Sequence, residues 1–157
     1  MADVQLITRA LIADVQAQAA RSPRRRMNFN FHASMEENPH RLLNVMLRGT
    51  YVRPHRHLDP PKAESFVMLQ GVARVFTFDD AGAVTASFRL EAGGDVMGVD
   101  LAAGLWHTVC AVTDCAVIYE IKPGPWSAAT DKSFAPWAPA EGDARVAEYM
   151  ARLLQSI

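Results

Sequence analysis

Three histidines and one glutamate have the residue types and the spacing of a metal site. His55 and His57 are two residues apart, so in a β-strand they lie on the same face. The Asp59-Pro60-Pro61 turn ends that strand, and an antiparallel return would bring the Glu64 carboxylate beside the two imidazoles. His107, at the start of a later strand, is the fourth candidate. Three imidazoles and one carboxylate suit a divalent transition metal, and these ligand types fit iron, manganese, zinc or nickel.

The same alternation predicts which residues surround the metal. Tyr51 and Arg53 share the face of the two histidines, and Phe66 and Met68 share the face of Glu64. We therefore expect an apolar pocket with one metal and one cation, in which Arg53 either binds an anionic group of the ligand or pairs with a carboxylate of the protein. The remaining histidines, His32 and His40, are outside this pattern.

The segment that contains these residues is expected to form several short strands. From residue 42 to 123, runs rich in Val, Phe, Thr and Leu alternate with Gly, Pro and Asp turns at intervals of about 8–12 residues. This pattern is typical of a β-sandwich or barrel, and no helical segment interrupts it. A connector over residues 23–41 precedes the barrel, and an irregular tail within residues 124–157 follows it. The Arg24-Arg25-Arg26 run is either a solvated part of the connector or an anion contact.

Amphipathic helices are expected at both ends. Apolar residues at three- and four-residue steps predict one helix over residues 3–20, within an N-terminal segment 1–22. A stripe from Val146 to Ile157 predicts a second helix, with Asp143 as its N-cap. That helix packs on the barrel or on a dimer partner. Val67 and Leu69 make their strand apolar on both faces, so the terminal helices or a second subunit must cover it, and we favour a homodimer.

Length and composition exclude several classes of protein. The chain has 157 residues, 50% of them hydrophobic, which fits one globular domain. Its net charge of −1 argues against a nucleic-acid-binding surface, and no apolar run is long enough to span a membrane. The two cysteines, Cys110 and Cys115, are too few for a disulfide framework, and we expect two small buried side chains in a cytoplasmic protein.

The metal-site residues also resemble the motifs of the cupin superfamily. Gly49, His55, His57, Glu64 and Gly71 resemble its first motif, although six residues separate His57 from Glu64 where three or four are usual. The stretch Ala102-x-Gly104-x-x-His107 resembles the second motif, with Ala in place of the usual Pro.

Further local motifs narrow the resemblance to the WbuC-type small cupin metalloproteins. They span residues 21–143 and include Tyr51-Val-Arg-Pro-His55-Arg-His57, Lys122-Pro-Gly-Pro125 and the segment 130–143. The resemblance implies an all-β fold, a single cupin jelly-roll barrel with a bound metal, in a family associated with O-antigen polysaccharide gene clusters. The resemblance does not imply a particular reaction.

Two functions therefore stay open. The first is a metal-dependent enzyme for a small polar or anionic, sugar-derived substrate, linked to surface polysaccharide biosynthesis. The second is a binding or sensing protein that captures a small ligand without turnover. The sequence has no GxSxG, GxGxxG or P-loop motif, and it does not choose between Tyr51 and Tyr119 as a proton-transfer group, so no catalytic residue is assigned.

Overall fold

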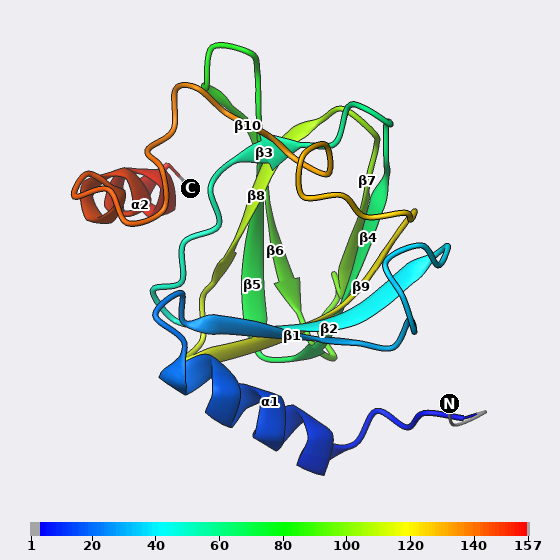
Figure 1. Ribbon diagram of the computed structural model, residues 1–157. Coiled ribbons are helices and arrows are strands. Elements are labelled where there is room, and N and C mark those ends of the chain that lie inside the picture. Colours follow the sequence, from blue (N-terminus) through cyan, green and yellow to red (C-terminus); the bar gives the residue numbers. More distant parts are fainter. Residues whose placement is uncertain (1–3, 157) are drawn as a thin grey trace.

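Two antiparallel sheets of five strands face each other in the computed structural model, which describes residues 4–156 (Figure 1). The first sheet has the order β1 (Arg26–Asn30), β2 (His40–Leu47), β9 (Cys115–Lys122), β4 (Glu64–Gln70) and β7 (Gly98–Leu101). The second has the order β10 (Ser133–Phe134), β3 (His55–Arg56), β8 (Trp106–Ala111), β5 (Val72–Phe78) and β6 (Val84–Glu91). The chain crosses between the sheets repeatedly, and the expected all-β jelly roll is confirmed.

The interior between the sheets is apolar at one end and polar at the other. Alternate residues of the strands point inward, and at one end they form a core that includes Met46, Phe66, Met68, Val75, Leu90, Val109 and Ile118. The histidines and Glu64 lie toward the other end of the same interior. The packed apolar end stabilises the barrel, and the open, polar end holds the cluster of histidines and Glu64.

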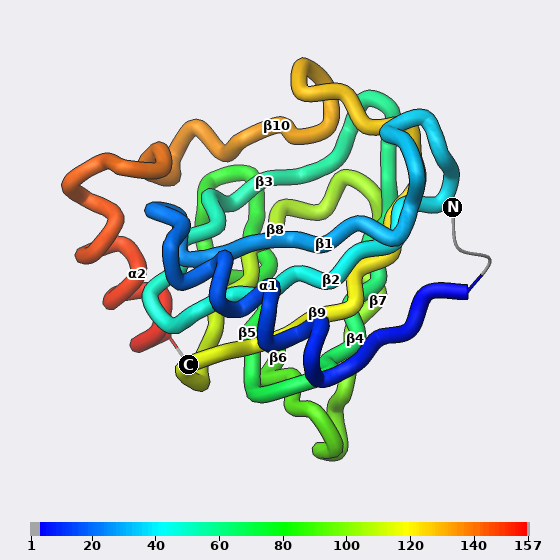
Figure 2. Tube along the Cα trace, turned by 60° about the horizontal axis from the view of Figure 1, so that its bottom comes forward, coloured from blue at the N-terminus to red at the C-terminus, as the bar shows by residue number. Residues whose placement is uncertain are grey.

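Helix α1 (Arg9–Arg21) covers the outer face of the first sheet over β1 and β2 (Figure 2). Val15 and Ala19 are fully buried there against strand residues. The helix begins later than the predicted residue 3 because the Thr8 hydroxyl caps it, accepting a hydrogen bond from the Leu11 amide at 3.1 Å. Residues 4–8 are not helical, and residues 1–3 of the predicted segment lie outside the described residues.

Helix α2 (Val146–Gln155) packs beside the second sheet through its buried residue Leu153. Leu153 is buried in a cluster with Phe78 and Trp106, so the helix packs on its own barrel. The N-cap is Arg145 and not the predicted Asp143, whose carboxylate instead accepts a hydrogen bond from the Arg145 amide at 2.9 Å. The last member of the predicted stripe, Ile157, lies outside the described residues.

The segment predicted as a connector, residues 23–41, contains strand β1. This strand pairs with β2 from Arg26 opposite Met46 to Asn30 opposite Leu42, so the first sheet begins earlier in the chain than expected. Since α1 lies over β1 and β2, it does not reach the outer face of β4. Val67 and Leu69 therefore stay 44% and 38% exposed.

The two cysteines are buried and free, as expected from their number. They lie on β8 and β9, which belong to different sheets, and burial raises the pKa of the Cys110 thiol to about 12. Across residues 4–156, neither helix is long and apolar enough to cross a bilayer.

Candidate metal centre

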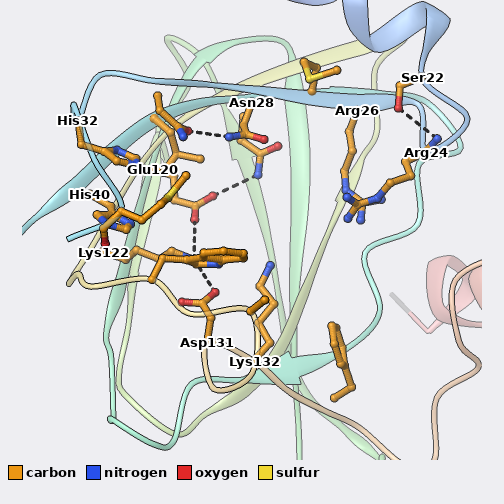
Figure 3. A pocket seen from close by; sticks show the side chains of 18 residues that line it. Ser22, Arg24, Arg26, Asn28, His32, His40, Glu120, Lys122, Asp131 and Lys132 are labelled. Carbon is orange, nitrogen blue, oxygen red and sulfur yellow. Dashed lines mark hydrogen bonds and ion pairs between the residues drawn. The ribbon is translucent and has the colours of Figure 1, made fainter. Parts of the chain in front are cut away.

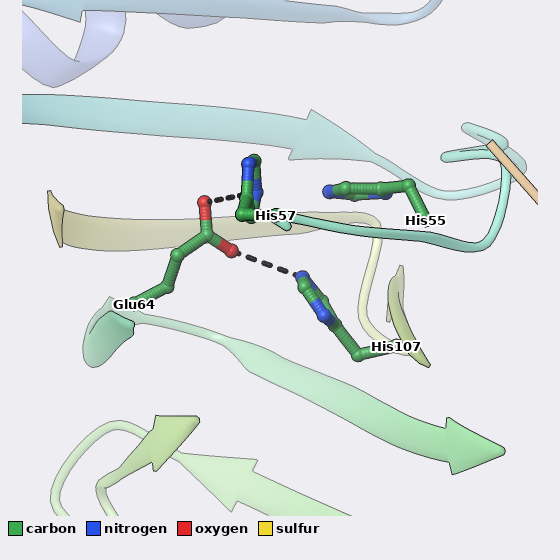
Figure 4. A group of neighbouring side chains, drawn as sticks. All are labelled: His55, His57, Glu64 and His107. Carbon is green, nitrogen blue, oxygen red and sulfur yellow. Dashed lines mark hydrogen bonds and ion pairs between the residues drawn. The ribbon is translucent and has the colours of Figure 1, made fainter. Parts of the chain in front are cut away.

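The fold brings His55, His57, Glu64 and His107 together inside the barrel (Figure 4). One ligand atom from each lies within 4.8 Å of all the others, and all four side chains are buried. His55 and His107 are paired on neighbouring strands of the second sheet. Glu64 arrives from β4 in the first sheet, so the expected antiparallel pairing of its strand with that of the histidines is wrong. The chain crosses to the opposite sheet after the turn at Leu58–Pro61, and Glu64 reaches the imidazoles across the interior.

Each of the three histidines is oriented by a backbone carbonyl. The Nδ1 atom of His55 lies 2.9 Å from the carbonyl oxygen of Arg53, and the Nδ1 atom of His107 lies 2.9 Å from that of Leu105. The Nδ1 atom of His57 contacts the carbonyl oxygen of Asp131. A carbonyl oxygen only accepts hydrogen bonds, so each Nδ1 carries the proton and each Nε2 is left as the ligand atom. This is the arrangement in which protein histidines bind metals.

The contacts of Glu64 call for a cation at the centre of the cluster. Its Oε1 atom lies 2.9 Å from Nε2 of His57, and its Oε2 atom lies 3.0 Å from Nε2 of His107. A carboxylate and an unprotonated Nε2 are both acceptors, so a positive charge, a proton or a metal ion, must lie between them. The Nε2 atom of His57 is also buried without a hydrogen-bond partner. The donor set therefore fits a divalent transition metal.

Burial and hydrogen bonding shift the pKa values in the direction that a metal site needs. Burial, with a smaller effect of His107, holds the pKa of His55 well below 6.5, so its imidazole is neutral. Burial acts to raise the pKa of Glu64, but its contacts with His107 and His57, which supply positive charge through a shared proton, outweigh burial and hold the pKa well below 4.5. The cluster thus offers a neutral imidazole at His55 and an ionised carboxylate at Glu64.

A network of buried charges that the sequence analysis missed surrounds this cluster. The Nζ atom of Lys122 lies 3.5 Å from Glu64 Oε1, 3.7 Å from Glu120 Oε1 and 3.2 Å from Asp131 Oδ2. Lys62 pairs with the other oxygen of Asp131 at 3.1 Å. Burial, then the charge of Glu64, raises the pKa of Glu120. The signal in the sequence was the placing of Glu120 and Lys122 two residues apart at the end of an apolar strand, which gives them its inward face.

The cluster opens into a small cavity that adjoins a larger one. A cavity of about 80 Å³ is lined by His55, Glu64 and His107, and a cavity of about 520 Å³ lies beside it (Figure 3). The two share a set of mostly polar lining residues: Arg24, Arg26, Asn44, Glu120, Lys132 and Phe134. The expected apolar pocket is therefore wrong. Strands β1, β2 and β9 supply Asn, Glu and Lys side chains to the cavities. The prediction missed them because it considered only the strands that carry the histidines and Glu64.

The four residues predicted to bind substrate have different positions. Arg53 and Phe66 line the smaller cavity, where Arg53 donates to the carbonyl oxygen of Ala135 at 2.7 Å. Met68 lies in the apolar core. Tyr51 does not line either cavity, and its hydroxyl donates to the carbonyl oxygen of Pro139 at 2.8 Å. Residues 51–54 do not form a strand, so the alternation that predicted Tyr51 does not hold there.

The other candidates lie at the larger cavity. His32 and His40 do not join the metal cluster, and their rings stack on each other with centroids 4.0 Å apart. Arg24 and Arg26 line both cavities, and both pair with Glu141, at 3.0 Å and 2.5 Å. Arg26 of the arginine run is thus largely buried at the site, its side chain 11% exposed, whereas the Arg24 side chain is 60% exposed to solvent at the cavity rim.

Comparisons with known proteins identify a family and a fold. A family described as a domain of unknown function, DUF6016, matches residues 7–90. No curated protein matches the chain.

Several solved structures are similar in fold. The capsular polysaccharide assembling protein CapF from Staphylococcus aureus has a TM-score of 0.58 and 16% identity, over 68% of this chain and 31% of its own. An L-ribose isomerase from Cellulomonas parahominis has a TM-score of 0.57 and 17% identity, over 72% and 70% of the two chains. KdgF from Halomonas sp. has a TM-score of 0.51 and 14% identity, over 66% and 82%. This chain spans under a third of the length of CapF, and these likenesses show the cupin fold alone.

Proposed function

The chain belongs to the DUF6016 family, and we propose that it is a metal-dependent cupin enzyme acting on a small polar or anionic, sugar-derived substrate. One observation carries the proposal: three Nε2 atoms and the Glu64 carboxylate converge at the inner end of a polar cavity. A divalent metal held by His55, His57, Glu64 and His107 supplies Lewis acidity to a substrate oxygen. The resemblance to the WbuC-type cupins supports a sugar-derived substrate.

The residues around the cluster have separate roles in this proposal. Arg53 and Phe66 form the wall of the smaller cavity, with Arg53 available to an anionic group of the substrate. The buried position of the cluster keeps bulk water away and strengthens every charge–charge contact inside it. Lys122 holds the carboxylate of Glu64 in place by its contact with Oε1 at 3.5 Å.

Elemental analysis of the purified protein and of a His57→Ala variant tests the metal site. We expect about one metal ion per chain in the wild type and a loss of at least tenfold in metal affinity in the variant, with the circular dichroism of the fold retained. His32→Ala is the matched control, because His32 is also a buried histidine but lies outside the cluster. Full metal occupancy in His57→Ala would contradict the ligand assignment.

A substrate screen then separates an enzyme from a binding protein. Sugar phosphates, nucleotide sugars and small keto acids are added to the metal-loaded protein, and both turnover and the thermal shift are measured. Turnover that His57→Ala abolishes supports the enzyme. A thermal shift without turnover supports the alternative, a metal-containing cupin that binds or senses a small ligand.

We also propose a cytoplasmic homodimer that forms through the outer face of β4. Val67 and Leu69 are exposed there, and Met97 beside them is 53% exposed, while both helices cover other faces. A cytoplasmic location agrees with the two free thiols. Light scattering of Val67→Glu tests the dimer: the variant should be monomeric, whereas Leu154→Glu, on the exposed side of α2, should leave the mass unchanged.

A further inference from the structure

All three lysines of the chain gather at the open end of the barrel. The chain has only Lys62, Lys122 and Lys132, whereas its other basic residues are arginines. Lys62 and Lys122 are buried and paired with Asp131. Lys132 makes no ion pair and no side-chain hydrogen bond with any residue between 4 and 156. From this we infer that the Lys132 amine binds an oxyanion group, a carboxylate or phosphate, of the small ligand.

The charges around Lys132 support this inference. The nearby carboxylates are engaged with other groups. Asp131 pairs with Lys62 and Lys122, and Glu141 pairs with Arg24 and Arg26. Glu120, which lines both cavities with Lys132, pairs with Lys122 at 3.7 Å and accepts a hydrogen bond from Asn44, and it makes no ion pair with Lys132 among the described residues. Burial, then the repulsion of Lys122, lowers the pKa of the Lys132 amine. A cation in such a place is stabilised by an anion that arrives with the ligand, and a bound metal would add further positive charge.

The position of Lys132 suits a ligand that also reaches the metal cluster. Lys132 lines both cavities, and its amine points into the larger one (Figure 3). The preceding residue, Asp131, holds the His57 ring through its carbonyl oxygen. Lys132 directly follows a turn over residues 127–131, which is closed by a hydrogen bond of 2.8 Å from the Asp131 amide to the Ser127 carbonyl. Two adjacent residues therefore orient a metal ligand and carry the anion-binding amine.

The remaining lining residues indicate what the rest of the ligand is like. Asn44 donates to Glu120 at 3.1 Å, and both residues face the two cavities beside Lys132. An amide and a carboxylate together recognise hydroxyl groups, which donate and accept. The ligand class is thus a small hydroxylated carboxylate or phosphate. The role of this ligand as a substrate rests on the proposed function, whereas the binding of its oxyanion group to Lys132 does not.

Calorimetric titration of the metal-loaded and the metal-free protein tests the inference with three probes. They are D-gluconate, its neutral counterpart D-gluconamide, and inorganic phosphate. We expect an oxyanion probe to bind, and gluconate to bind at least about tenfold more tightly than gluconamide, because a charge-assisted contact is lost with the amide. Binding of phosphate with no binding of gluconate would assign the site to phosphorylated ligands and would still support the oxyanion site.

Substitution of Lys132 gives the second half of the test. Lys132→Met and Lys132→Gln should weaken oxyanion binding about tenfold to a hundredfold, with metal content and unfolding midpoint unchanged. Arg152→Met removes one positive charge from an exposed ion pair on α2 and should change nothing. The inference is overturned if no oxyanion binds the wild type, if gluconamide binds as well as gluconate, or if both Lys132 variants bind as the wild type does. Absence of metal with anion binding retained would overturn the proposed function and leave this inference standing.

Discussion

The Nδ1 atom of His57 contacts the backbone carbonyl oxygen of Asp131, a residue 74 positions later in the chain. This contact fixes the proton on Nδ1 and turns Nε2 toward Glu64, 2.9 Å away. The side chain of the same Asp131 pairs with Lys62 and Lys122. The tail after the barrel is thus part of the metal centre, and the following predictions test this arrangement and its neighbours.

The first prediction concerns Asp131→Asn. The substitution leaves Lys62 and Lys122 buried without their shared counter-charge, and it loosens the turn that holds His57. We expect a loss of about 3–5 kcal/mol in the free energy of unfolding and roughly tenfold to a hundredfold in metal affinity. Urea unfolding and competition with a chelator measure the two effects. Asp114→Asn is the control, since that carboxylate is 97% exposed and its pair with Arg48 is worth under about 1 kcal/mol.

The second prediction concerns the stability of the metal-free protein in acid. The folded-state pKa of His55 lies below its ordinary 6.5 and that of Glu64 below 4.5, so the unfolded chain binds protons first. The stability that each group contributes is therefore complete above its ordinary pKa and is lost as the pH falls toward its folded pKa. Glu120 has a raised pKa and acts in the opposite direction.

A comparison of the wild type with His55→Asn isolates the contribution of His55, because Glu64 and Glu120 are common to both. Urea unfolding with a chelator present, between about pH 7.5 and pH 5, should show the wild type losing more stability than the variant. Equal losses, or a wild type that gains relative to the variant on acidification, would show that burial does not keep His55 neutral.

The third prediction concerns Tyr51→Phe. The hydroxyl of Tyr51 donates to Pro139 at 2.8 Å, and the residue does not line either cavity. The substitution should lower the free energy of unfolding by about 0.5–1.5 kcal/mol, the net worth of one hydrogen bond, and leave metal content and gluconate binding unchanged. Denaturation and calorimetry measure both. A stable variant that no longer binds the ligand would restore Tyr51 to the site.

The fourth prediction uses two neighbouring leucines of α2. Leu153 is 5% exposed and packs in the cluster with Phe78 and Trp106, whereas Leu154 is 39% exposed. Leu153→Ala should cost about 2–5 kcal/mol in unfolding free energy, and Leu154→Ala about 0.5 kcal/mol or less. Similar costs for both variants at low protein concentration would mean that α2 does not pack on its own barrel in this way.

The sequence predicted the parts of this protein that depend on local alternation. His55 and His57 share a face because they are two residues apart, and Glu64 and His107 were predicted as further ligands at the starts of later strands. The same four residues also resemble the cupin motifs. The all-β fold and the helix at each end followed from turn spacing and apolar periodicity. Where the local geometry departed from a strand, as at Tyr51, the same reasoning failed.

The tertiary structure decided which distant segments meet. Nothing in the spacing of Glu64 said that it would cross to the opposite sheet, and nothing near His57 pointed to Asp131. The gathering of Lys62, Lys122 and Lys132 depends on three separate segments that close the same end of the barrel. The physical reason is that alternation fixes the side of a strand on which a residue lies, whereas the packing of the two sheets fixes what lies across from it.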